Sequence, residues 1–400
     1  MKILILSDGF AAPAFKPRLR SLCEYLIQKG HTIRVFCEKA DALTFEHIYP
    51  IDEIALYKNS FADWAIKNIG TILFNWKERT FENRVERLLK DEVYDLVFCT
   101  SFHSFPLRAA NRIARKRNIP CVLDLRDMME QAPANKMLYL SHHMSWLKPF
   151  AAIYLHQHLL RRNKELRKAD AITSVSPWHI DLLRTITTKP CHLIYNGYDN
   201  TVFMPNNIPT SSFKIVYTGK VFPTPQQDPT LLFQAIKRLP YSPEQLSVCW
   251  YTDFASEQLI KSFAKQAGVE AYMQYYGIVR KEEIVTILQE ASICLVLTNL
   301  AGDESGHGKM TTKFFEALGV EKPVLCVRSD EECLAQVIRQ THAGLSACNI
   351  DEVIHFIQEK YVEWQREGYT RQSIDQHIKS RYSRQYQSEQ WEHIFLDLKK

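Results

Sequence analysis

The sequence lacks any apolar run of 18 residues, and its ten cysteines include no CxxC pair. Without such a run we expect no membrane-spanning helix, and without paired cysteines we expect no zinc site. Several cysteines lie inside apolar segments, which favours reduced core residues of a cytosolic protein. The first segment, KILILS (2–7), soon meets Asp8 and is interpreted as a buried strand, not a signal peptide.

A strong charge imbalance is also missing. The net charge is +5 with a sequence pI of about 8.5, which is too weak to indicate a nucleic-acid-binding protein. A mildly basic chain suits an anionic substrate or an acidic membrane surface. The length of 400 residues favours two domains.

The first half of the chain alternates short apolar segments with amphipathic ones, which is typical of a parallel, doubly wound sheet. Predicted strands are 2–7, 32–38, 94–101, 119–127 and 171–176, and helices are predicted at 16–30 and 106–118. Residues 52–92 and 128–168 break this rhythm. Both mix aromatic and apolar residues with lysine and arginine.

A linker is predicted around residues 200–212, where DNTVFMPNNIPTSSF shows little periodicity. The alternation then restarts with strands at 214–219, 246–252, 271–277, 293–298 and 323–327, and helices at 228–239, 256–268 and 280–291. We therefore expect two doubly wound halves, with the cleft between them as the default ligand site.

The segment GHGKMTTKFFEALGVEKPVLCV (306–327) combines a glycine-lysine loop, a helix start and a buried strand. Glycine lets the backbone approach a ligand, and a helix N-terminus favours a phosphate. Thr311 and Thr312 are placed to cap the helix or to bond a phosphate oxygen. The alternative is a loop that only caps a surface helix, with Glu316 as a solvated helix residue.

Two strand ends carry charges at the predicted ligand edge. Gly219 and Lys220 end VYTGK, where lysine would meet a diphosphate as a point charge unless it is only a solvated loop residue. Asp124, Arg126 and Asp127 end CVLDLRD. Such charges are costly to bury unless they are paired or used, and the alternative role is an Arg–Asp pair that braces a loop.

Together these stretches resemble the retaining, nucleotide-sugar-dependent glycosyltransferases of family 4, in a divergent subgroup with DLRD. The resemblance rests on RLRSLCEYLIQKGHTIRVF, ADAITSVSP, IYNGYDNTVF, VYTGK, TKFFEALGVEKPVL and YSRQYQSEQWEHIFLDL. It implies the α/β GT-B fold, in which two Rossmann-like domains face a cleft. Residues 1–207 would be the acceptor-side domain and 208–380 the nucleotide-sugar domain, while a final helix, 381–400, crosses back onto the first domain.

The resemblance also implies residue roles on the donor side. Glu316 matches the glutamate that holds the ribose hydroxyls, and Lys220 matches a basic residue on the diphosphate. The backbone of residues 310–312 matches the helix start near the distal phosphate, so no metal and no other cofactor is expected. The predicted donor-binding residues are Gly219, Lys220, Arg280, Thr311, Thr312, Lys313 and Glu316, with 277–280 near the nucleobase.

Three departures from the family pattern stand out. Gly308 occupies the position of a second glutamate, whose sugar contact would be missing or supplied by His307, Lys309 or Glu304. Lys313 would substitute for a missing second basic residue, and Arg126 stands where many members have histidine. The predicted catalytic residues are Asp127 and His103, and the predicted acceptor-side residues are Arg18, Asp124 and Arg126.

The favoured function is a cytoplasmic glycosyltransferase that moves a hexose-type sugar to a glycan or lipid-linked acceptor in cell-surface polysaccharide or glycoconjugate synthesis. The alternative is a catalytically degenerate GT-B protein that binds a nucleotide sugar or a partner enzyme without turnover. A third possibility is a GT-B epimerase or phosphorylase, but the resemblance of NGYDNTVF to family 4 disfavours it. If residues 128–168 form amphipathic helices, we expect contact with the anionic inner face of a membrane. A buried helix pair with a solvated basic face is the alternative.

Overall fold

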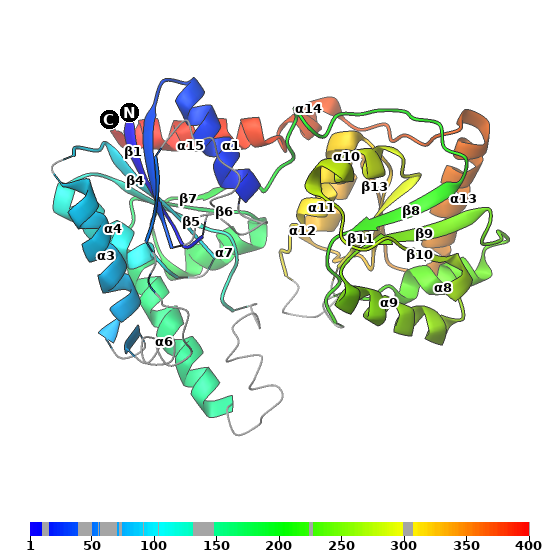
Figure 1. The fold of residues 1–400 in the computed structure, drawn as a ribbon, viewed down its shortest axis with the longest axis horizontal. Coiled ribbons are helices and arrows are strands. Elements are labelled where there is room, and N and C mark those ends of the chain that lie inside the picture. The colour runs from blue at the N-terminus through cyan, green and yellow to red at the C-terminus, as the bar shows by residue number, and fades with distance from the viewer. Residues whose placement is uncertain are drawn as a thin grey trace. The chain divides into compact units, whose positions relative to one another are not determined.

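The computed structural model forms two compact units, which Figure 1 shows as two sets of strands with their helices. Unit 1 comprises Met1–Tyr195 and Gln387–Lys400, and unit 2 comprises Asn196–Tyr386. The structure describes residues 1–9, 16–38, 50–54, 56, 70–71, 74–90, 92–102, 104–130, 148–223, 227–298 and 307–399. All ten cysteines lie in these ranges, and each is free.

Unit 1 is built on a seven-stranded parallel sheet with the order β3-β2-β1-β4-β5-β6-β7. Its strands are β1 (Lys2–Ser7), β2 (Thr32–Cys37), β3 (Ile51–Glu53), β4 (Leu96–Ser101), β5 (Cys121–Leu125), β6 (Ala171–Ser174) and β7 (Cys191–Leu193). Its helices are α1 (Lys16–Gln28), α3 (Trp76–Leu89), α4 (Leu107–Arg117), α6 (Lys148–Leu166) and α7 (Pro177–Ile186). The strand order reverses direction between β1 and β4, which is where doubly wound sheets bind ligands.

The central strands of unit 1 are largely apolar because helices cover both faces of the sheet. Alternate residues of β1 enter different clusters: Leu4 and Leu6 pack with α3 and α4, whereas Ile3 and Ile5 pack with α1. The continuous run at the start of the chain therefore has a physical cause, since both faces of this strand are buried.

Helix α15 (Arg384–Lys399) completes unit 1 with its residues from Gln387 onward. Trp391 and Phe395 bury against Phe98 of β4, with ring centroids 5.8 and 5.4 Å away. Glu392 accepts a hydrogen bond from the Tyr25 hydroxyl at 2.7 Å and lies 2.8 Å from Nε2 of His31. The last helix is thus fixed to the first helix and the sheet by both apolar and polar contacts.

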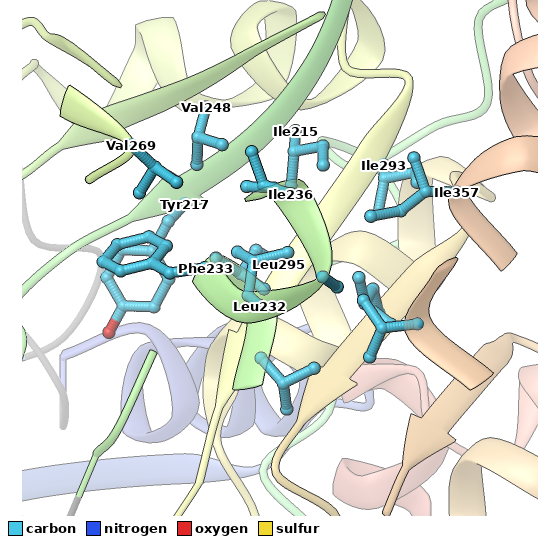
Figure 2. Close-up of a cluster of buried hydrophobic side chains, with 14 of the residues drawn as sticks. Ile215, Tyr217, Leu232, Phe233, Ile236, Val248, Val269, Ile293, Leu295 and Ile357 are labelled. Carbon is cyan, nitrogen blue, oxygen red and sulfur yellow. The ribbon is translucent and has the colours of Figure 1, made fainter. Parts of the chain in front are cut away.

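Unit 2 is built on a six-stranded parallel sheet with the order β10-β9-β8-β11-β12-β13. Its strands are β8 (Phe213–Thr218), β9 (Leu246–Tyr251), β10 (Met273–Tyr275), β11 (Ile293–Leu297), β12 (Val324–Val327) and β13 (Gly344–Ala347). Its helices are α8 (Thr230–Arg238), α9 (Phe254–Ala267), α10 (Lys281–Gln289), α11 (Thr312–Val320), α12 (Cys333–Thr341), α13 (Ile350–Glu367) and α14 (Gln376–Ser380). Figure 2 shows part of its core, where Phe233 and Ile236 of α8 meet Ile215 and Tyr217 of β8.

The end of unit 1 differs from the boundary expected after residue 207, because the next segment packs on unit 2. Asn196 donates through its side-chain amide to the carbonyl of Met310 at 3.1 Å. A Cβ on Gly319 would lie 2.7 Å from Cβ of Phe203 and 2.9 Å from Cδ2 of Tyr198. Glycine at this position lets the connecting segment lie directly on α11.

One predicted strand is shorter than expected. The sequence predicts a continuous strand over residues 271–277. In the structure, Glu270–Tyr272 form a single 3-10 turn and β10 covers only Met273–Tyr275. Gly277 has a φ of 72°, a left-handed conformation that ends the extended segment. The alternating sequence therefore predicted the element but not its ends.

Candidate functional site

The donor-side residues expected from the sequence lie at the carboxyl end of β8 and the start of α11. Gly219 directly follows β8, has a φ of 97° and donates its N–H to the carbonyl of Tyr251 at 2.8 Å. A Cβ on Gly219 would lie only 3.0 Å from Cε of Lys313. Both the backbone conformation and the close approach of lysine therefore require glycine here.

Lys313 lies in the first turn of α11, where a cation faces the positive end of the helix dipole. Its ammonium lies over the Tyr217 ring, 5.2 Å from the centroid. Burial lowers the pKa of Lys313, and the Glu316 carboxylate opposes that shift. A desolvated cation at a helix N-terminus is unfavourable alone, so an anion bound beside it would relieve the cost.

The start of α11 has the geometry expected of an anion site. Thr311 is the N-cap, and its hydroxyl accepts the N–H of Lys313 at 3.4 Å. Thr312 is the first helical residue. The remaining N–H groups of this turn point along the helix axis, as those of any α-helix start do. The predicted capping role of Thr311 is thus present, whereas phosphate binding by either threonine stays a prediction.

Glu316 follows Lys313 by three residues on α11, so the two share one side of the helix. Burial raises the pKa of Glu316, and the charges of Arg384, Lys313 and Lys281 lower it, Arg384 most strongly. A carboxylate among three cations stays ionised more readily than burial alone would allow. Glu316 is half-buried and not fully solvated, and its contact with a ribose stays a prediction.

Arg384 is a residue that the sequence analysis missed. It begins α15, is 7% exposed, and donates its backbone N–H to the carbonyl of Tyr198 at 2.8 Å. Its guanidinium lies 3.6 Å from the carboxylate of Asp199. The sequence offered no local signal for this charge, because Arg384 reaches Glu316 only through the tertiary fold.

Lys220 and Arg280 lie at the surface of unit 2. The Lys220 side chain is 69% exposed, and its ammonium is 3.5 Å from Asp253. Arg280 precedes α10, where its N–H donates to Glu283 at 2.8 Å in a capping box. Lys220 is adjacent to Gly219 in the chain, but Lys313 is the lysine that packs against that glycine.

Gly308 is buried and has a φ of 65°. The neighbouring His307 is hydrogen-bonded through Nδ1 to the carboxylate of Glu332, which directly precedes α12. A carboxylate from a distant segment thus lies next to the position where the family often has glutamate. Of the predicted substitutes, Lys309 is exposed, and Glu304 lies outside the described residues.

On unit 1, Asp124 and Arg18 are buried below the carboxyl edge of the sheet. Asp124 accepts hydrogen bonds from Thr173 at 2.6 Å, Thr100 at 2.8 Å and Arg18 at 3.3 Å. Arg18 also donates to the carbonyl of Ile194 at 2.9 Å. The cavity beside them has a volume of about 10 Å³, room for one water molecule. The pair joins β4, β5 and β6 to α1, and its contact with an acceptor stays a prediction.

Arg126 and Asp127 follow β5 at the carboxyl edge. Arg126 is 7% exposed and lies over the Phe102 ring at 5.9 Å, while Asp127 is exposed. Burial lowers the pKa of Arg126 to about 10, so it remains a cation at neutral pH. His103, the other predicted catalytic residue, lies outside the described residues.

A second carboxylate at this edge, Asp8, was not singled out as a site residue from the sequence. It directly follows β1 and accepts the N–H of Phe102 at 2.8 Å. Burial raises its pKa to about 7. A signal was present, because an acid immediately after the first strand of a parallel sheet falls at the ligand-binding edge.

Within the ranges that the structure describes, no three His, Cys, Asp or Glu residues gather as a metal site. Over the same ranges, no helix has the length and apolar character needed to cross a membrane.

Comparison with known proteins adds a family match over part of the chain and a fold. Residues 18–202 match the family model Glycosyltransferase Family 4, and no curated protein matches the chain. The chain is similar to a sucrose-phosphate synthase from Thermosynechococcus elongatus, with 14% identity, a TM-score of 0.69, and coverage of 100% of this chain and 99% of that one. It is also similar to Anabaena HepE in complex with UDP, with 13% identity, a TM-score of 0.65, and coverage of 99% and 100%. HepE has also been solved with UDP-glucose.

A third similar structure is the lipopolysaccharide outer core galactosyltransferase WaaB, with 12% identity, a TM-score of 0.62, and coverage of 99% of both chains. These likenesses extend over nearly the full length of each chain. The expected α/β class with two parallel, doubly wound sheets is confirmed.

Proposed function

We propose that this chain, whose residues 18–202 match Glycosyltransferase Family 4 and whose fold is that of GT-B proteins, is a glycosyltransferase of that family. It transfers a hexose-type sugar, with retention of configuration, to a glycan or lipid-linked acceptor. The donor is a nucleotide diphosphate-sugar bound by unit 2, and the acceptor is bound by unit 1. The observation that carries the proposal is the approach of Lys313 to Gly219 at the start of α11.

The diphosphate is the group that this arrangement fits best. It becomes more negative as the bond to the sugar breaks, so fixed positive groups stabilise the transition state. Lys313 supplies a charge and the first turn of α11 supplies N–H donors. These groups are held in place before the donor binds, which avoids the cost of reorganising them during the reaction.

Glu316 then holds the ribose. An ionised carboxylate only accepts hydrogen bonds, and two adjacent ribose hydroxyls both donate them. The neighbouring cations, Arg384 first among them, favour this ionised form. The complexes of HepE with UDP and UDP-glucose support a uridine donor as the first one to test.

We propose that catalysis needs no metal, since Lys313 and the helix start supply the positive charge. Turnover that continues in excess EDTA would support this, and loss of turnover that Mg²⁺ restores would contradict it.

The proposal is tested by measuring donor binding to the full-length chain. UDP-glucose, GDP-mannose, ADP-glucose and a CMP-sugar are compared by thermal shift and titration calorimetry, because a ligand that binds the folded state raises its melting temperature. We expect one donor to bind and to be turned over. Glu316→Gln and Lys313→Met should each weaken its binding about ten- to a hundredfold, the usual cost of a lost hydrogen bond to a charged group.

Two exposed residues of unit 2 provide matched controls. Glu359 is 72% exposed on α13, and Lys261 forms an exposed pair with Glu257 on α9. Glu359→Gln and Lys261→Met should leave donor affinity unchanged. Failure of all four donors to bind the wild-type chain would overturn the proposal.

A non-catalytic, sugar-binding protein is the second candidate, and Gly308 favours it because the usual carboxylate is absent there. The hydrogen bond between His307 and Glu332 weighs against it, since it brings a carboxylate beside that position. Product analysis with the donor found above separates the two functions. Donor binding without transfer or hydrolysis over a day would establish the non-catalytic function.

We further propose that the enzyme acts in the cytoplasm, at an anionic membrane surface. Helix α6 carries exposed Ile153, Leu160 and Lys164, and exposed Arg167 directly follows its last residue. Apolar and basic groups on one helix favour binding to an anionic interface. Co-sedimentation with phosphatidylglycerol vesicles, but not with phosphatidylcholine vesicles, is the expected result. Lys164→Glu with Arg167→Glu should abolish it.

A further inference from the structure

The carboxylate of Asp8 lies at the topological switch point of the unit 1 sheet. β1 pairs in parallel with β4, with Ser7 opposite Thr100, and β4 pairs with β5, with Ser101 opposite Leu125. The three central strands therefore end at the same edge. Asp8 directly follows the first of them, at the edge where open α/β sheets bind their ligands.

The contacts of Asp8 satisfy only one of its two oxygens. Oδ2 accepts the N–H of Phe102 at 2.8 Å. Oδ1 is buried and has no hydrogen-bond partner among the described residues. The Ser7 hydroxyl accepts the N–H of Gly9 at 3.3 Å, which holds the backbone on both sides of Asp8. A fixed carboxylate with an unsatisfied buried oxygen is costly in the unliganded protein.

The charges around Asp8 come from three elements. Lys77 of α3 and Arg126 after β5 both favour its ionised form, and Phe102, directly after β4, contributes its N–H. The thiol of Cys99, on β4, is close enough for its pKa to be raised in part by Asp8. Desolvation outweighs the cations and raises the pKa of Asp8 to about 7.

We infer that Asp8 determines acceptor specificity by accepting a hydrogen bond from a hydroxyl group of a sugar-containing acceptor. The free Oδ1 needs a donor, and a sugar hydroxyl supplies one. The Arg126 side chain, whose charge acts on Asp8, carries only donors, so the two side chains together match the mixed donor and acceptor character of a polyol. This inference rests on the proposed function and assigns the acceptor side of it.

The test uses defined sugars in place of the unknown acceptor. Binding of methyl α-D-glucopyranoside, methyl β-D-galactopyranoside and octyl β-D-glucopyranoside to the full-length chain is measured by saturation-transfer NMR and calorimetry. We expect at least one to bind, and Asp8→Asn to weaken it roughly tenfold or more. The asparagine oxygen still accepts the Phe102 N–H, so a purely structural role for Asp8 predicts no change.

Asp95 provides a matched control at the opposite edge of the same strand pair. It directly precedes β4 and accepts the N–H of Lys2 on β1 at 2.7 Å. Asp95→Asn therefore makes the same chemical change without touching the carboxyl edge, and sugar binding should be unchanged. Equal weakening by both substitutions would show a general effect on unit 1 and overturn the inference.

The pH dependence gives an independent readout that needs no variant. Sugar affinity of the wild-type chain should rise as pH increases through about 7, because only the carboxylate accepts on both oxygens. The rise should disappear in Asp8→Asn. A flat profile in the wild type, or no binding of any of the three sugars, would overturn the inference. Donor binding is measured separately in the wild type and in Asp8→Asn. Absence of donor binding would instead count against the proposed function.

Discussion

Lys313 packs directly against Gly219: a Cβ on the glycine would lie 3.0 Å from Cε and 3.3 Å from Nζ of the lysine. The contact joins the end of β8 to the start of α11. It brings the lysine so close that any side chain at residue 219 would have to displace it. Lys313, and not the exposed Lys220, is thus the lysine whose position the fold determines.

Gly219→Ala should therefore weaken donor binding about tenfold and destabilise unit 2. The φ of 97° is unfavourable for alanine and costs about 1–2 kcal/mol. The added methyl group also displaces the Lys313 side chain from the helix start. Calorimetry measures the donor affinity and urea unfolding measures the stability, so the two effects can be separated.

Gly268→Ala is the matched control for that substitution. Gly268 ends α9 with a φ of 73°, and a Cβ there would meet only Nζ of Lys237, at an ordinary 3.7 Å. It should lose similar stability while donor affinity stays unchanged. Equal loss of donor affinity in both variants would show that backbone strain alone, and not the lysine, controls binding.

The sequence offered candidate site residues where these lie within one strand end or one helix. Gly219 and Glu316 could be singled out because each belongs to a short local pattern, and the succession of strands along the chain followed from the alternation of apolar and amphipathic segments. Element ends were less predictable, as at β10, where a 3-10 turn replaces part of the strand.

Residues that act through tertiary contacts could not be predicted in this way. Arg384 belongs to the last helix, yet its charge acts on Glu316 of α11. Asp124 and Arg18 form their pair across segments far apart in sequence, so nothing local distinguishes a buried brace from an exposed ligand contact. Glu332 reaches His307 in the same manner.

Arg384→Gln should make donor binding depend on pH. The Arg384 charge lowers the pKa of Glu316 against the effect of burial, so its removal raises that pKa and protonates Glu316 at a higher pH. Each unit of further shift costs up to tenfold in donor affinity below the new pKa. Calorimetry over a series of pH values should show the donor affinity of Arg384→Gln falling at a higher pH than that of the wild type.

Arg381→Gln serves as the comparison for Arg384→Gln. Arg381 is exposed and lies 2.9 Å from His377 in the preceding turn. The donor affinity of Arg381→Gln should follow the wild-type pH profile. If Arg384→Gln also follows that profile, Arg384 has no part in setting the ionisation of Glu316.

Asp124→Asn should destabilise unit 1 by about 3–5 kcal/mol, because it leaves the buried Arg18 cation without its counter-charge. Asp181→Asn is the comparison, since Asp181 is 75% exposed and pairs with Arg184 at 3.4 Å. It should cost less than about 1 kcal/mol. Urea unfolding measures both, and a cost for Asp124→Asn no greater than that for Asp181→Asn would contradict the bracing role.

Glu78→Gln should stabilise the protein at pH 8.5 and have little effect at pH 5. Glu78 accepts the N–H of Ala109 at 3.1 Å, and desolvation raises its pKa from 4.5 to about 8. Between these values the folded state holds a proton that the unfolded state has lost, so stability falls as pH rises. Each pKa unit corresponds to at most about 1.4 kcal/mol. Glutamine keeps the acceptor and never ionises.

On the same helix, the pKa of Glu86 is lowered by hydrogen bonds with Arg117 and Lys116 that outweigh its burial, so Glu86→Gln should instead destabilise at neutral pH. Urea unfolding measures the stability of both variants at pH 5 and 8.5. If the free energy of unfolding of Glu78→Gln differs from that of the wild type by the same amount at both pH values, Glu78 does not hold a proton in the folded state.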